Sequence, residues 1–338
     1  MLTLLLALQA AAPAATPKSP GEIVAEAPAA DWVDMKPDDL LVMQLAPDRD
    51  GKPRRVVIQL MPPPFSQPWI ANIRTLAKAH WWDGTSVNRV QDNYVAQWGD
   101  ATEKKALPAG LQPTSEKDYV TSPAAIGEAD QQHIELKKGE SASDALLAVQ
   151  KRASELEAAT QISIQATRTD TAPKGWHQRD AYAAWTETYK AWPLASDMSV
   201  LWPVHCYGMV GVGRDLSPNA GNGTELYVVI GHAPRHLDRN IALVGRVIEG
   251  IENLSSLPRG TGNLGFYEKP EQRVPIVSIR MASDLPVAEQ PRLQYLSSDS
   301  ATYHRYVAAR ANRKDAFFIV AAGGADICNV PVPVRRKP

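Results

Sequence analysis

The chain has 338 residues, and 44% of them are hydrophobic, which suffices for one large domain or two smaller ones with a packed core. Its 36 basic and 37 acidic residues leave a formal net charge of −1, so no strong field would attract nucleic acid or anionic lipid. The composition therefore argues against both as partners.

The first 30 residues have the character of an export signal followed by a structureless segment. Residues 2–8 form an apolar run ahead of alanine-rich sequence, as in a secretory signal, although the usual basic start is missing. The run is too short to span a bilayer. A frayed apolar tail is the alternative. Because proline and alanine continue to residue 30, we expect residues 1–30 to be disordered or removed, and the protein to be periplasmic or secreted.

A hairpin and a helix follow in the sequence. Residues 40–45 and 55–60 are rich in branched side chains, and the Asp-Gly step within residues 47–53 predicts a longer loop between two paired strands. Ser66 is placed to cap a helix, because apolar residues repeat at helical spacing over residues 69–77.

Residues 81–100 carry the most informative pattern in the chain. Val87 and Arg89 alternate in a short segment that predicts a strand, and residues 94–97 predict its neighbour. A fixed cation beside an aromatic and apolar wall and an amide is unusual in a strand that serves only the fold. On these residues alone, Arg89 is either a buried arginine with satisfied hydrogen bonds or an arginine that binds a ligand.

Residues 101–200 form a long stretch with a different character. A helix is predicted over residues 143–159, and tryptophans recur at wide spacing in and just beyond the stretch, at positions 176, 185, 192 and 202. Burial of tryptophan is a large apolar contribution, so this stretch is predicted to be a packed lid or subdomain rather than a free linker.

The end of the chain is predicted to contain a helix over residues 300–313 and an apolar strand over residues 316–320. The final basic residues, 335–337, are expected to be a solvated terminus rather than a binding patch.

The order of the motifs resembles the signature of the cyclophilin family. In that family a YDG-type turn leads to a Phe-His-Arg-Val strand and then to a Phe-Met-x-Gln-Gly-Gly-Asp strand, and residues 83–85, 87–90 and 94–100 are similar to these elements in order. Further blocks are similar to later segments of the family, namely residues 208–213, 222–228, 236–238, 244–250 and, as the closing strand, 274–280.

The resemblance implies a mostly β fold in which helices cap a closed antiparallel β-barrel. The barrel domain would span residues 38–283, with a long insertion at about residues 101–200. Residues 284–338 would be a C-terminal extension.

The resemblance also implies a prolyl isomerase site. Rotation about a peptide bond costs about 18–20 kcal/mol, and a donor aimed at the proline nitrogen weakens the conjugation that causes this barrier. Arg89 suits this role because a guanidinium stays protonated and offers rigid donors, and Gln97 would hydrogen-bond Arg89 and the substrate backbone. The resemblance places substrate binding at Asn88, Tyr94, Val95, Tyr227, Leu237 and Ile241, and backbone pairing with the peptide at Gly213 and Arg214.

Several of these positions depart from the residues usual in the family. Tyr94 and Tyr227 replace phenylalanine, so each adds a hydroxyl that must find a partner. The other changes are Asn88 for histidine, Val95 for methionine, Trp98 for glycine, Glu225 for glutamine and Ile241 where many members have histidine. They imply catalysis that is weaker than typical or confined to certain substrates.

The two cysteines, Cys206 and Cys328, leave two alternatives open. Export favours a disulfide that ties the C-terminal tail to the domain, and two buried thiols are the other reading. Neither cysteine lies in a CxxC pair, and the histidines show no ligand spacing, so no metal or cofactor is expected. Asp238 is expected to cap a turn.

The sequence therefore predicts a peptidyl-prolyl cis-trans isomerase that assists protein folding in the cell envelope. The alternative is a barrel that holds proline-containing segments with little or no turnover. A third hypothesis makes the tryptophan-bearing insertion a site for partner docking. The sequence does not determine the oligomeric state or the client proteins.

Overall fold

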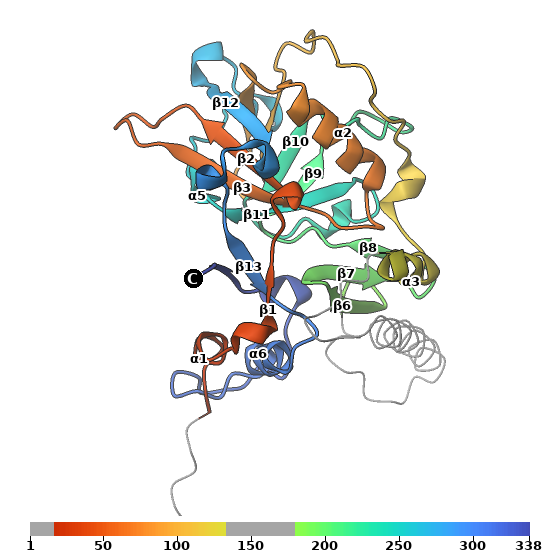
Figure 1. The fold of residues 1–338 in the computed structure, drawn as a ribbon, viewed down its shortest axis with the longest axis vertical. Coiled ribbons are helices and arrows are strands. Elements are labelled where there is room, and N and C mark those ends of the chain that lie inside the picture. The colour runs from red at the N-terminus through yellow and green to blue at the C-terminus, as the bar shows by residue number, and fades with distance from the viewer. Residues whose placement is uncertain (1–16, 133–179) are drawn as a thin grey trace, which may run out of the picture.

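The computed structural model describes residues 17–132 and 180–338, and its centre is a closed antiparallel β-barrel (Figure 1). This confirms the predicted fold class. In the order in which they are hydrogen-bonded, the barrel strands are β10 (Leu226–Val229), β5 (Val95–Gly99), β4 (Ser86–Val90), β12 (Val274–Met281), β2 (Leu40–Leu45), β3 (Arg54–Leu60), β11 (Leu243–Glu249) and β9 (Met209–Val212).

The predicted hairpin is confirmed as β2 and β3. Their register runs from Leu40 opposite Gln59 to Leu45 opposite Arg54. The side chain of Asp48 accepts hydrogen bonds from two backbone N–H groups within the connecting loop, which closes the turn.

Helix α2 (Gln67–Lys78) covers the barrel and packs against β12. Trp69, Ile73 and Leu76 are fully buried in the main core, as the helical spacing predicts. Ser66 stands at the N-cap position of α2, as expected, but its side chain does not cap the helix. Ser66 adopts a left-handed conformation with φ of 52°, and its hydroxyl makes no capping hydrogen bond.

The insertion contributes a second sheet that packs on the barrel. Its strands are β6 (Trp185–Tyr189), β7 (Trp192–Ser196) and β8 (Leu201–Pro203), with helix α3 (Pro123–Gln132) beside them (Figure 1). Trp192 and Trp202 are each 1% exposed and share the main core with the barrel, so this part is a packed subdomain. The predicted helix over residues 143–159 and Trp176 lie outside the described residues.

A third sheet joins the two ends of the chain. It consists of β1 (Trp32–Asp34), β13 (Leu293–Leu296) and β14 (Val334–Arg336), and helix α1 (Pro20–Ala25) packs against helix α6 (Ala301–Ala311) below it (Figure 1).

The remaining short helices of the described residues are α5 (Glu252–Ser255), η1 (Ala29–Asp31), η2 (Pro37–Asp39), η3 (Glu116–Tyr119), η5 (Arg235–Leu237), η6 (Asn263–Gly265), η7 (Pro270–Gln272), η8 (Ala282–Asp284), η9 (Val287–Glu289) and η10 (Ile327–Asn329).

Residues 20–25, which lie in the segment expected to be disordered or removed, form helix α1 in the structure. A capping box at Ser19 starts α1, and Ile23 and Val24 pack against the cluster that contains Trp32 and Tyr303. The short apolar face of α1 is thus partly buried against this cluster, which the local composition does not reveal.

The C-terminal extension matches its predictions in part. The predicted helix is confirmed as α6, but residues 316–320 form no strand, and Phe317 and Ile319 are 83% and 100% exposed. The place beside β13 is taken by β14 instead. Arg336 and Lys337 are exposed, as expected for a solvated end, and they form surface ion pairs with Glu249 and Asp34.

Cys206 and Cys328 form a disulfide, with their Cα atoms 5.0 Å apart. The bond ties the C-terminal extension to the segment that enters β9. No helix within residues 17–132 and 180–338 is both long and apolar enough to cross a bilayer.

Candidate functional site

One row of residues across four barrel strands organises the site. Arg89 on β4 lies opposite Gln97 on β5, Gln97 lies opposite Tyr227 on β10, and Tyr227 lies opposite Gly211 on β9. Directly opposed residues in a sheet point to the same face. The alternate residues Ala96, Trp98 and Val228 belong to the main core, so this row faces outward.

A β-bulge sets the row in register at its first strand. The pairing of β4 with β5 shifts between Val87 and Arg89, which leaves Asn88 as the extra residue. As a result Arg89, and not its neighbour, points to the same side as Gln97. Asn88 is buried, with 5% exposure, and lies against the floor of the same cavity.

Arg89 is held by three hydrogen bonds. Its Nε donates to the carbonyl oxygen of Leu264 at 2.7 Å, one terminal nitrogen donates to Gln97 Oε1 at 3.1 Å, and the other donates to Gln91 Oε1. The guanidinium also lies 5.7 Å from the ring centre of Tyr94 and 5.4 Å from that of Phe266. Burial lowers the pKa of Arg89, but arginine remains protonated.

An apolar cluster separate from the main core lies beside Arg89. Val95, Tyr227 and Val229 are its buried members, and Tyr94, Leu237 and Ile241 pack against them. The side chains come from β5, β10 and the η5 segment, so the barrel wall and the loop after β10 together form the pocket.

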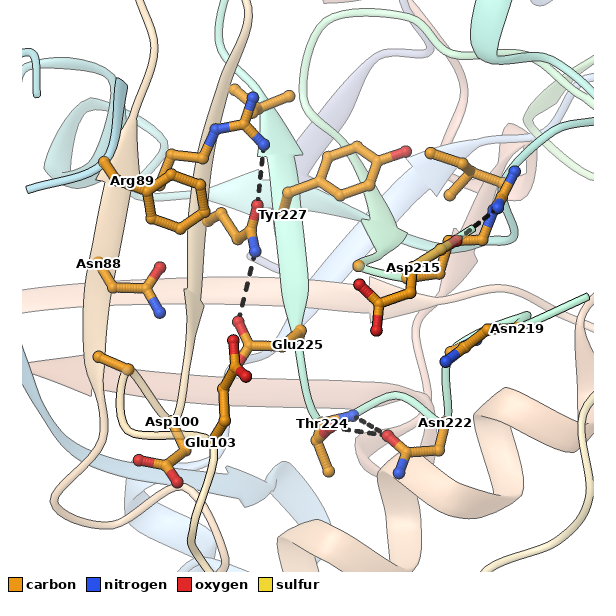
Figure 2. A pocket seen from close by; sticks show the side chains of 18 of the residues that line it. Asn88, Arg89, Asp100, Glu103, Asp215, Asn219, Asn222, Thr224, Glu225 and Tyr227 are labelled. Carbon is orange, nitrogen blue, oxygen red and sulfur yellow. Dashed lines mark hydrogen bonds between the residues drawn. The ribbon is translucent and has the colours of Figure 1, made fainter. Parts of the chain in front are cut away.

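All the residues predicted for catalysis and substrate binding line one cavity of about 990 Å³. Figure 2 labels Asn88, Arg89 and Tyr227 among them. They are Asn88, Arg89, Tyr94, Val95, Gln97, Gly213, Arg214, Tyr227, Leu237 and Ile241. The N–H of Gly213 is already bonded to the carbonyl oxygen of Glu225 at 2.8 Å, so other backbone groups of this segment would have to pair with a peptide.

The hydroxyl that distinguishes Tyr227 from phenylalanine has a buried partner. His205 is fully buried, and its Nε2 lies 2.9 Å from the Tyr227 hydroxyl while its Nδ1 lies 2.9 Å from Asp238 Oδ1. Burial lowers the pKa of His205, and the ring is neutral at pH 7. Because the carboxylate can only accept, Nδ1 carries the proton and Nε2 accepts from Tyr227.

The network continues away from the cavity. Asp238 Oδ2 accepts from Arg235 Nε at 2.7 Å, and Arg235 makes a two-bond ion pair with Asp180. Burial opposes ionisation of Asp238, but hydrogen bonds from His205 and Arg235 outweigh it and lower the pKa of Asp238. From the sequence, Asp238 was expected only to cap a turn. In the structure its carboxylate also joins the pocket wall to a buried ion pair.

Glu225 is a further site residue, which the sequence marks only as a replacement for the glutamine usual in the family. It follows the Asn-Gly-Thr turn into β10 and receives a hydrogen bond from Gln97 Nε2 at 3.4 Å (Figure 2). Burial raises its pKa to about 7, although the hydrogen bond from Gln97 opposes the shift. The replacement of the usual glutamine by glutamate at position 225 was the feature of the sequence that could have identified this residue.

Phe266 and Leu264 were also missed. Strand β12 pairs with β4 only at Val87 and Ser86, and beyond that point the chain near residues 263–267 runs along β4 instead. This brings the Phe266 ring and the Leu264 carbonyl to Arg89. No motif in the sequence marks this loop.

Glu225→Gln is expected to flatten the pH dependence of stability. Between pH 4.5, the ordinary pKa, and about 7 the folded protein holds a proton that the unfolded chain has lost. The free energy of unfolding therefore falls as pH rises through this window, by about 1–3 kcal/mol for a partly buried carboxyl. Urea unfolding at pH 5 and pH 8 measures this: the gain of the variant over wild type should be larger at pH 8. Equal differences at both pH values would contradict it.

Comparisons with known proteins agree with this geometry. The family model described as cyclophilin type peptidyl-prolyl cis-trans isomerase/CLD matches residues 55–281, a range that includes every barrel strand except β2 and the first residue of β3. The crystal structure of cyclophilin AquaCyp293 from Hirschia baltica is similar with a TM-score of 0.56 and 20% identity, over 91% of this chain and 94% of that one.

A match to one curated relative covers a smaller part of the chain. Peptidyl-prolyl cis-trans isomerase CYP23 from Arabidopsis thaliana is 36% identical over 75 residues, which are 22% of this chain and 32% of that protein. The match thus spans about a third of the relative's length. Since the family model covers more than half of the chain, and the barrel, the bulged arginine strand and the adjoining apolar pocket accompany it, the chain belongs to the cyclophilin-type peptidyl-prolyl cis-trans isomerase family.

Proposed function

We propose that this protein is a peptidyl-prolyl cis-trans isomerase that assists folding of exported proteins in the cell envelope. The observation that carries the activity is the Arg89 guanidinium, held at the edge of an apolar pocket by three hydrogen bonds. A guanidinium has five N–H donors, so donors remain for a bound peptide.

The apolar pocket and the Arg89 guanidinium have different roles in isomerisation. Tyr227, Val95 and Leu237 provide apolar surface for a pyrrolidine ring, while Arg89 donates toward the proline nitrogen. Such a donor localises the nitrogen lone pair and lowers the barrier to rotation, and a preorganised donor of this kind contributes several kcal/mol, on the order of 3. No proton transfer, nucleophile or metal is required by this scheme.

Export is supported by two features. Residues 2–8 resemble a secretory signal, and the Cys206–Cys328 disulfide is the kind of bond that persists in oxidising compartments. Sequencing the N-terminus of protein recovered from the periplasm of an expressing cell tests this part. Protein that stays in the cytoplasm with its first residues intact would contradict it.

The activity is tested with a peptide that holds one X-Pro bond. Uncatalysed exchange takes tens of seconds or longer, so its acceleration is measured directly. The rate should rise linearly with the concentration of wild-type protein, and Arg89→Ala should return it to near the uncatalysed value. Equal rates for the two proteins would remove the claim of isomerase activity.

A second candidate function is a binding module with little turnover. Asn88, Val95 and Ile241 alter the walls of the cavity from the pattern usual in the family, and these changes favour the second candidate. Titration of the same peptide would show binding without acceleration in that case, whereas robust turnover would exclude it.

A further inference from the structure

A chain of side chains leads from Arg89 to a carboxyl group in the cavity. Gln97 Oε1 accepts from Arg89 at 3.1 Å, and Gln97 Nε2 donates to Glu225 Oε2 at 3.4 Å (Figure 2). The amide of Gln97 thus has its acceptor end at the cation and its donor end at the carboxylate. This is the orientation that both neighbours favour.

The carboxyl group of Glu225 occupies space that is free because residue 99 is a glycine. Glu225 immediately precedes β10 and lies beside Gly99 at the end of β5, so a Cβ at Gly99 would be only 1.8 Å from Glu225 Oε1. The nearby Asn88 side chain and the backbone N–H of Asp100 also favour the ionised form of this carboxyl group and so act to lower its pKa. A larger residue at position 99 would exclude the carboxyl group from this place.

We propose that Glu225 is a positioning residue of the isomerase site, whose carboxylate holds the Gln97 amide in the orientation that supports Arg89 and so links activity to its own protonation. The inference rests on the proposed isomerase function. When Glu225 is ionised, Gln97 donates to a full charge, and such bonds are roughly twice as strong as neutral ones. When Glu225 is protonated, this bond weakens, and its O–H competes with Arg89 for Gln97 Oε1.

The proton on Glu225 exchanges in the physiological range, because burial raises its pKa to about 7. The neighbouring carboxylate, Asp100, is fixed as an anion by bonds from Thr102 and the backbone of Lys104 and Lys105, which lower its pKa despite burial. The other charged groups that line the cavity are Glu103, Lys105, Asp215, Arg214 and Arg273, with Arg89 beyond Gln97.

The test is the pH profile of kcat/KM for one X-Pro peptide between pH 5.5 and 8.5. Wild-type activity should rise about fivefold across a single titration near pH 7, as expected from the gain of one charge-assisted bond. Glu225→Gln keeps the shape and an acceptor oxygen but cannot ionise, so its profile should be flat. Glu128→Gln, which neutralises an exposed carboxylate on α3 outside the cavity, should keep the wild-type profile.

A second variant and a second readout separate positioning from folding. Gly99→Ala should displace the carboxyl group without removing its charge, and should also flatten the profile. In NMR spectra, the chemical shifts of the Gln97 side-chain amide should change with pH, with a midpoint near pH 7, in wild type and not in Glu225→Gln. An active wild type with the same profile and the same Gln97 titration as Glu225→Gln would overturn the inference alone. A wild type without isomerase activity would overturn the proposed function and the inference together.

Discussion

Replacing Arg89 by alanine is expected to lower kcat/KM for an X-Pro peptide by a factor of about 10²–10³, the usual loss for one preorganised donor aimed at a transition state. Arg89 is the cation that the β4 bulge turns toward the apolar pocket, and three bonds fix its plane. The loss should fall mainly on kcat, because the pocket that grips the proline ring is left in place.

Two further variants make this prediction sharper. Arg89→Lys keeps the charge but not the fork of donors, so its activity should lie between those of wild type and Arg89→Ala. Arg259→Ala removes a cation that pairs with Asp92 outside the cavity, and should leave the rate unchanged. An Arg89→Ala protein with wild-type kcat/KM would show that the guanidinium takes no part in catalysis.

The sequence predicted the parts of the site that lie close together along the chain. Arg89 and Gln97 sit on two strands joined by a short turn, so their motifs already imply that they face each other. The apolar residues of the pocket, Val95 and Tyr227, were also found, because a family signature fixes the order of strands that local patterning cannot.

The sequence did not predict the contacts that depend on irregular or distant segments. Phe266 reaches Arg89 only because β12 leaves β4 early, and strand patterns do not show where a pairing stops. His205 and Asp238 are 33 residues apart and meet only in the folded barrel. A histidine without ligand spacing and an aspartate in a turn each have common structural explanations, and so their pairing was not foreseen.

Departures from the family pattern were visible in the sequence, but their consequences needed the structure. Tyr227 in place of phenylalanine is accommodated by His205 behind it and by Gly211 opposite, where a Cβ would lie 2.3 Å from the hydroxyl. Glu225 in place of glutamine fits because Gly99 leaves room. The first change adds a hydroxyl and the second exchanges an amide for a carboxyl group; each new group has a partner in place, and neither change disrupts the cavity.

Asp238→Ala is expected to destabilise the protein by about 3–5 kcal/mol, because it removes one partner from a buried network of charges. Arg235 would keep its bonds to Asp180, but His205 would lose the acceptor for both its backbone N–H and Nδ1. The His205 ring could then change tautomer and cease to accept from Tyr227. The pocket wall would lose its fixed position, so peptide affinity should fall together with the free energy of unfolding.

Tyr227→Phe separates these two effects. It removes the hydroxyl but leaves the ring and the Asp238 network, so it should cost about 1 kcal/mol in stability and leave most of the activity. Asp284→Ala, at an exposed carboxylate outside the network, serves as the matched control for loss of one negative charge. Urea unfolding and peptide titration of the three variants test whether the Asp238 carboxylate holds the pocket wall in place. If Asp238→Ala is as stable as Tyr227→Phe, the buried carboxylate does not hold the pocket wall, and the wall must be fixed by apolar packing with Val95 and Val229 alone.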